Sequence, residues 1–238
     1  GKEIIGNNYI LSVGGKSYPV TGSKGDGFMW VKKMGHDVIV PKPALTPIEI
    51  KEQWLKNLQG LSLKGIRISV VQDGKVLLKK DGELVFAHFG LGGPMILDMS
   101  RNIGDFLEKG KVRMDIDLLP NLTQEELEKE IQALVDSNKN KLLENILKEI
   151  LPDKMVSYII YFSGVKSNKK GFDLKKEERQ KIARVIKKIE VNVVGLLGFD
   201  RAMATHGGVS LGEIDSKTMK SKIVDNLYFA GEIINLDG

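Results

Sequence analysis

The residues best suited to chemistry lie near the end of the chain, where a short apolar run stops at a glycine and a carboxylate. The run covers residues 227–230, and Gly231 and Glu232 follow it directly. A second acidic-glycine pair, Asp237 and Gly238, comes shortly afterwards. In sheets that bind nucleotides, a carboxylate at the end of a buried strand accepts hydrogen bonds from sugar hydroxyls. These four residues are therefore candidate ligand-binding residues.

A glycine pair near the start of the chain is a second candidate. Gly14 and Gly15 end an apolar run, and a loop rich in glycine and hydroxyl residues continues to residue 27. Paired glycines let the backbone come close either to another segment or to a ligand. The loop leads into a predicted helix, whose free amides would suit an anion. It is not a Walker loop, because the Gly-Lys-Ser/Thr signature is missing.

The chain has three histidines, His36, His88 and His206. His206 is the best candidate for a catalytic residue, because an imidazole can exchange a proton near neutral pH. The competing interpretation, which we favour, is that His206 is a hydrogen-bonded structural residue. We favour a structural role more strongly still for His36 and His88. Three widely spaced histidines without any cysteine predict no metal site.

The composition is that of an ordinary globular protein, with 42% hydrophobic and 28% charged residues among 238. The absence of cysteine fits a reducing compartment, so we expect a cytoplasmic protein. No apolar run approaches the length of a membrane span, so we expect no membrane partner.

The elements that must position these residues change in type along the chain. Residues 66–70 and 112–118 alternate between apolar and polar side chains, which is typical of strands with one wet face. Asp73-Gly74 and Asp81-Gly82 each predict a hairpin turn, so we expect a three-stranded meander in a small antiparallel sheet or barrel.

A helical region follows. Thr123 and Glu126 have the spacing of a capping box, and apolar residues then recur at helical spacing up to Pro152 and again near residue 185. Residues 164–190 hold ten basic and four acidic residues. A single aromatic residue, Phe172, lies in this basic run and provides no interleaved aromatic platform, so we expect a solvated or paired helical face and do not expect nucleic acid as a partner.

A set of short motifs, in order along the whole chain, resembles one known family. It is that of the aminoacetone-oxidase-like flavoproteins, also called BaiN-like or YhiN-like FAD-dependent oxidoreductases. The segments that carry the resemblance are residues 12–27, Gly35-His36, residues 43–47, 86–94, 205–209, 213–215, 218–222 and 227–232.

The resemblance implies a mixed α/β and α+β fold. Residues 1–48 and 196–238 would form a partial two-dinucleotide-binding (FAD) fold, residues 49–119 and 190–195 an inserted small β-barrel, and residues 120–189 an α-helical subdomain. It also implies roles in binding FAD. Gly14 and Gly15 would lie on the phosphate side, Gly231 and Glu232 at the ribityl chain, and Asp237 and Gly238 at the start of a loop toward the isoalloxazine. The segment that contains His206 would lie close to the flavin.

The sequence also departs from the family pattern. It has no G-x-G-x-x-G motif before its first strand, and the family's glycine-rich flavin loop does not follow Gly238. We therefore expect a fragment of a FAD-dependent oxidoreductase, with FAD in the full-length parent and absent or weakly bound in this chain. The chain alone would then be inactive. The small-molecule substrate is unknown, and NAD(P)H is the candidate reductant. The alternative is a non-catalytic insert-domain module whose basic helical face binds a partner or polyanion.

Overall fold

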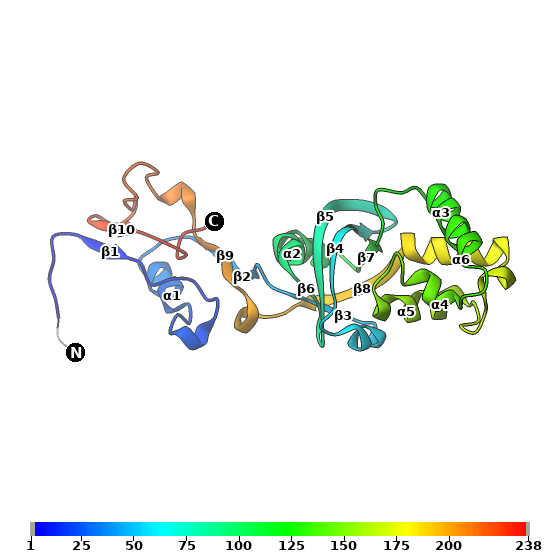
Figure 1. The fold of residues 1–238 in the computed structure, drawn as a ribbon. Helices are drawn as coiled ribbons and strands as arrows, with labels where there is room; N and C mark the ends of the chain where they lie inside the picture. The colour runs from blue at the N-terminus through cyan, green and yellow to red at the C-terminus, as the bar shows by residue number, and fades with distance from the viewer. Residues whose placement is uncertain (1–2, 237–238) are drawn as a thin grey trace. The chain divides into compact units, whose positions relative to one another are not determined.

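The computed structural model describes residues 3–236, and within the chain two compact units can be distinguished (Figure 1). The first comprises Gly1–Ile48, Ile96–Gly104 and Leu196–Gly238, and the second comprises Glu49–Met95 and Asp105–Gly195. The three-part division that the sequence suggests stays a prediction.

The first unit contains two small sheets. Strand β1 (Tyr9–Leu11) pairs in parallel with β10 (Leu227–Phe229), and β2 (Val38–Ala44) pairs antiparallel with β9 (Ala204–Val209). Helix α1 (Asp26–Lys33) buries Phe28 and Val31 against Val209, Phe229 and their neighbours. Single turns of 3-10 helix lie at Pro19–Thr21, Phe199–Arg201 and Leu211–Glu213.

The second unit is built on a closed barrel with the strand order β3-β6-β5-β4-β7-β8. The strands are β3 (Ile48–Ile50), β4 (Ser62–Gln72), β5 (Lys75–Ala87), β6 (Gly90–Gly92), β7 (Val112–Asp117) and β8 (Ile189–Leu196). In β7 every second side chain is buried, including Met114 and Ile116, as the alternation predicts. The mixed α/β character of the chain and its barrel are thus both present.

The two predicted hairpins have different outcomes. Asp73 and Gly74 have φ values of 49° and 76° and connect β4 to β5, which confirms the first turn. The second turn is wrong, because Asp81 and Gly82 lie inside the continuous strand β5. Asp81 pairs with Arg67 of β4, whose guanidinium Nε lies 2.6 Å from the carboxylate. A Cβ at position 82 would lie 3.1 Å from Cβ of Met95, so the glycine serves a close approach rather than a turn.

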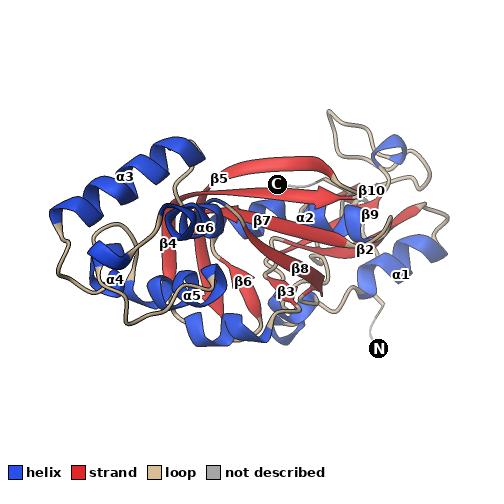
Figure 2. Cartoon of the chain, turned by 90° about the vertical axis from the view of Figure 1, so that its right-hand side faces the viewer, coloured by secondary structure: helices blue, strands red, loops and turns tan. Residues whose placement is uncertain are grey.

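Four helices of the second unit gather beyond one end of the barrel strands (Figure 2). They are α3 (Gln124–Ser137), α4 (Leu143–Leu147), α5 (Asp153–Ser163) and α6 (Lys176–Lys187). The predicted capping box at the start of α3 is confirmed, since Thr123 and Glu126 exchange side chain-to-backbone hydrogen bonds. Short 3-10 helices lie at Gln53–Leu58 and Gly171–Asp173.

One more helix, α2 (Pro94–Leu107), contributes residues 96–104 to the first unit. Its start at Pro94 agrees with the preference of proline for the first helical turn. Among residues 3–236, no helix is both long enough and apolar enough to cross a membrane.

Candidate functional site

The candidate site of the first unit begins at the carboxyl ends of β1 and β10. The two strands are parallel and in register from Tyr9 with Leu227 to Leu11 with Phe229. The turns that follow them therefore leave the sheet at the same edge, so the glycine pair and the Gly231-Glu232 pair come together. In open α/β sheets, ligands bind outside the carboxyl ends of the strands.

The carboxylate of Glu232 is the centre of this arrangement. Its Oε2 accepts a hydrogen bond from the backbone N–H of Gly15 (3.1 Å). Its Oε1 accepts one from the hydroxyl of Ser17 (2.8 Å) and another from the backbone N–H of Thr205. A carboxylate has about four acceptor positions. Three are thus used inside the protein, and one position on Oε2 remains for a further donor.

Thr205 strengthens the same junction. Its hydroxyl oxygen accepts hydrogen bonds from the backbone N–H groups of Lys16 (2.7 Å) and Ser17 (3.1 Å). Thr205 is 4% exposed, so these bonds form away from water. Glu232 and Thr205 together tie the loop after β1 to strand β9 and to the end of β10. Ser17 and Thr205 lie in two of the segments that carry the family resemblance, but nothing in the sequence indicates that their side chains meet Glu232.

The glycines have separable roles. A Cβ on Gly15 would lie 2.4 Å from Oγ1 of Thr205 and 2.7 Å from Cδ of Glu232, so the close approach at this position is to other protein segments. Gly14 and Gly231 have φ values of 73° and 78°, the left-handed conformation that glycine adopts without strain. Asp237 and Gly238 lie outside the described residues.

A cavity of about 220 Å³ lies beside Glu232 and Thr205 in the first unit. Three side chains of α2, Leu97, Asp98 and Arg101, also line it. Leu97 and Arg101 are four residues apart and therefore share a helix face. They are more than 100 residues from Glu232 in sequence, so no local pattern relates them to it. The sequence feature that points to this part of the site is the Gly-Gly-Pro before α2, which marks where the helix begins.

The three histidines lie in different surroundings. His36 is 3% exposed, and its ring nitrogens contact the carboxylate of Glu213 (3.0 Å) and the hydroxyl of Ser221 (2.9 Å), which is a structural role. His88 lies in the second unit against the ring of Phe89. His206 is half-buried next to Thr205 on β9. Successive side chains of a strand point to opposite faces, so His206 faces away from the side on which Thr205 meets the loop.

Within residues 3–236, no group of three or more His, Asp or Glu side chains is arranged to hold a metal ion.

Comparison with known proteins establishes the family. Residues 42–204 match the family described as HI0933-like protein barrel and H2TH domain. This match covers more than half of the chain, so the chain belongs to the HI0933-like family, a family of flavoprotein oxidoreductases. The resemblance recognised from the ordered motifs is thereby confirmed.

Three curated relatives extend the comparison beyond the barrel. The chain is 26% identical to the 3-dehydro-bile acid delta(4,6)-reductase of Clostridium scindens, over 100% of this chain and 58% of the relative. It is 33% identical to the ribosomal RNA dihydrouridine synthase of Haemophilus influenzae, over 97% of this chain and 55% of the relative. The enzyme of the same name from Escherichia coli is 25% identical, over 96% and 54%. The chain therefore spans about half the length of the curated relatives it matches.

Proposed function

We propose that this chain forms part of a FAD-dependent reductase that saturates a carbon–carbon double bond conjugated with a carbonyl group. The single observation that carries the proposal is the junction at Glu232, where a carboxylate at the carboxyl end of two parallel strands keeps one acceptor position for a ligand. Membership of the family supports flavin-dependent redox chemistry.

The names of the relatives support this choice of reaction. A delta(4,6)-reductase removes double bonds at two numbered positions of its substrate, and dihydrouridine is uridine whose ring double bond is saturated. Both changes add one hydride and one proton across a carbon–carbon double bond for each bond reduced. We therefore infer the shared bond type for this chain, with NAD(P)H, oxidised to NAD(P)⁺, as the source of the hydride.

The residues present fit one part of FAD. Glu232 would hold a hydroxyl of the ribityl chain through its remaining acceptor position, and Gly231 would provide the turn that aims the carboxylate. Gly14 would lie on the phosphate side, where it allows the left-handed turn. Gly15 fits contact with Thr205 and Glu232 better than contact with a ligand. In this proposal the first unit is part of a dinucleotide-binding fold. When bound, FAD supplies the hydride chemistry.

The remaining tasks fall to side chains of the protein. Addition of hydride to the far carbon of a conjugated carbonyl places negative charge on the carbonyl oxygen, which a fixed cation stabilises. Arg101 carries such a charge at the cavity beside Glu232. The neighbouring carbon then needs a proton. His206 is the candidate donor named from the sequence, and because it points to the opposite face of β9 from Thr205, its role needs a test of its own.

A binding module that acts through its basic helical face is the second candidate, and the contacts of the basic side chains argue against it. Lys187 lies 2.7 Å from Asp117, Lys169 lies 2.7 Å from Glu178, and Lys188 lies 2.6 Å from Glu190. Several cations of the run thus already have carboxylate partners within the second unit. We therefore favour the reductase.

The test measures FAD binding and hydride transfer separately. The full-length protein to which this chain would belong is purified and titrated with FAD while flavin fluorescence is followed. NADH or NADPH oxidation is then measured with a steroid 4,6-dien-3-one and with uridine-containing RNA. We expect FAD binding that Glu232→Ala weakens, and NAD(P)H oxidation with at least one acceptor.

Two results would count against the proposal. Unaltered FAD affinity in Glu232→Ala would remove the role of the carboxylate. Tight FAD binding without NAD(P)H oxidation in the presence of either acceptor would contradict the proposed reduction of a conjugated double bond. His206→Asn separates the proton donor from a structural role, since loss of the proton donor lowers kcat and changes its pH profile while FAD affinity stays the same.

A further inference from the structure

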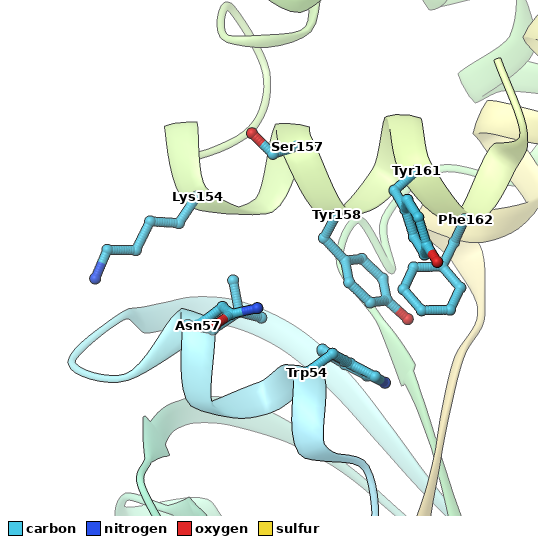
Figure 3. A pocket seen from close by; sticks show the side chains of 8 residues that line it. Trp54, Asn57, Lys154, Ser157, Tyr158, Tyr161 and Phe162 are labelled. Atoms are coloured by element: carbon cyan, nitrogen blue, oxygen red, sulfur yellow. The ribbon is translucent and has the colours of Figure 1, made fainter. Parts of the chain in front are cut away.

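The second unit carries a surface of aromatic rings that the proposed reductase does not use. Trp54 comes from the 3-10 helix Gln53–Leu58, whereas Tyr158, Tyr161 and Phe162 come from α5 (Figure 3). The ring centroids of Trp54 and Tyr158 are 4.1 Å apart, and those of Tyr158 and Phe162 are 4.3 Å apart. The rings of Trp54, Tyr158, Tyr161 and Phe162 therefore form one row, which we call the aromatic row.

The aromatic row is open to solvent on one side. Tyr161 is 77% exposed and Phe162 is 45% exposed, which is unusual for large apolar side chains that already contact one another. A cavity of about 540 Å³ lies along the row, with Asn57, Lys154 and Ser157 also at its wall. A second cavity, of about 520 Å³, shares Trp54, Tyr158 and Phe162 with the first. Volumes of this size suit a ligand rather than a few waters.

Two cations lie at the cavities beside the aromatic row. Lys154, Tyr158 and Phe162 follow one another at intervals of four residues and share one face of α5, with Lys154 at one end and Phe162 at the other (Figure 3). Nζ of Lys154 donates one hydrogen bond, to the backbone oxygen of Gln59 (2.9 Å), which leaves two of its three donors for a ligand. Arg184 of α6 lines the second cavity and is exposed, and its side chain makes no hydrogen bond or ion pair with another described residue.

The acidic groups nearby are already engaged. Glu52 accepts hydrogen bonds from the backbone (2.9 Å) and the side-chain amide (2.7 Å) of Asn192, and Glu190 is paired with Lys188 (2.6 Å). Burial and the charge of Glu52 both raise the pKa of Tyr158, so its phenol stays neutral. Asn192 is uncharged, so Glu52 keeps its negative charge. Among the described residues that line the two cavities, Lys154 and Arg184 are the cations without a carboxylate partner.

We propose that the aromatic row, with Lys154 and Arg184, is a binding site for single-stranded RNA. Unpaired bases stack on aromatic side chains while cations bind the flanking phosphates, and this combination is how proteins hold single strands. The hydroxyl of Ser157 and the amide of Asn57 line the same cavity and can bond a ribose 2′-hydroxyl, which distinguishes RNA from DNA. The basic run of residues 164–190 holds a single aromatic residue, so the sequence alone does not predict nucleic acid as a partner. Folding brings Trp54 and α5 to Arg184 instead.

The site can be tested without flavin, so the result is independent of the proposed reductase. The chain has two tryptophans, so in Trp30→Phe the tryptophan fluorescence comes from Trp54 alone. Titration with oligouridylate and oligoadenylate RNAs of about 12 nucleotides should quench this fluorescence to saturation. The affinity should fall as salt is raised, because phosphates are neutralised by protein cations.

Matched variants locate the site. Phe162→Ala should weaken binding about tenfold, the loss expected for one stacked base. Lys154→Ala and Arg184→Ala should each weaken binding severalfold and reduce its salt dependence. The controls are Phe172→Ala, which removes another exposed ring of the second unit (60% exposed), and Lys181→Ala on the exposed side of α6. Both controls should bind as the unaltered protein does.

Other outcomes would overturn the proposal. Absence of quenching, equal losses in the controls, or equal affinity for DNA of the same sequence would each do so. Self-association that Phe162→Ala abolishes would assign the surface to contact between copies of the chain. If Phe162→Ala lowers the melting temperature, Tyr161→Ala replaces it, because its more exposed ring contributes less to stability.

Discussion

At the scale of single residues, Glu232 organises the first unit because three donors from two distant segments converge on its carboxylate. Gly15, Ser17 and Thr205 are brought together by this one side chain. Hydrogen bonds to a charged acceptor stabilise a fold more than neutral ones do. The same carboxylate therefore has a structural role that can be measured apart from any cofactor.

Glu232→Gln tests this structural role. The amide nitrogen of glutamine cannot accept a hydrogen bond, so at least one of the donors now bound to the carboxylate loses its partner. We expect the free energy of unfolding to fall by about 1–3 kcal/mol. Urea denaturation measures the change, with Asp225→Asn as the control, because the side chain of Asp225 is 96% exposed. Equal effects of the two substitutions would contradict the role assigned to Glu232.

Gly15→Ala tests whether the close approach is to protein or to ligand. The added methyl would lie 2.4 Å from Oγ1 of Thr205, so the junction must shift, and we expect a destabilisation of about 1–3 kcal/mol. The matched control is Gly212→Ala, where the nearest atom, Oγ of Ser210, is 3.7 Å away. Thermal unfolding gives both values. A stable Gly15→Ala protein with weakened FAD binding would instead place the ligand at Gly15.

At the scale of elements, β5 shows how a local turn signal is overruled. Asp81 and Gly82 have the residue types of a hairpin turn, but the strand continues through them because strand β4 and helix α2 both contact this part of β5. Arg67 of β4 forms two hydrogen bonds with the carboxylate of Asp81, and Met95 packs against Gly82. Tertiary contacts thus decide the length of the strand.

The pair of Arg67 and Asp81 predicts a pH dependence. The hydrogen bond from Arg67 lowers the pKa of Asp81 below its ordinary value. A lowered pKa in the folded state means that the contribution to stability is present above the unfolded pKa, and is lost as the pH falls through the folded value. Asp81→Asn should therefore destabilise the protein slightly at neutral pH and have no effect in strong acid. Unfolding curves of both proteins across this range would show a constant difference if the pair contributed nothing.

At the scale of the whole molecule, each of the two units has its own buried core. Phe229 is 1% exposed in the first unit, and Ile146 is fully buried in the second. Each unit also contains one tryptophan, Trp30 in the first and Trp54 in the second. The unfolding of each unit can therefore be followed separately.

Phe229→Ala should destabilise the first unit by about 3–5 kcal/mol, because it removes a large buried side chain and leaves a cavity. When Phe229→Ala is combined with Trp54→Phe, the fluorescence of Trp30 reports the first unit, and we expect its unfolding transition to move to lower urea concentration. The transition reported by Trp54 in Trp30→Phe should stay in place. A single transition that moves equally for both tryptophans would show that the units unfold together.

The sequence alone determined those features that depend on neighbours along the chain. The capping box at Thr123, the Asp73-Gly74 turn, the alternation in β7 and the ordered family motifs all follow from local residue types, and the structure or the family match confirms each. Gly14, Gly231 and Glu232 could be named in advance for the same reason, because each lies within three residues of the end of a strand.

Only the tertiary structure decided which distant side chains meet. Ser17 and Thr205 reach Glu232 because parallel pairing of β1 with β10 brings three segments to one edge. The aromatic row exists because the 3-10 helix that carries Trp54 packs against α5. Side chains separated by more than 100 residues meet through packing and strand register, and neither is encoded in the spacing of residues along a single stretch of chain.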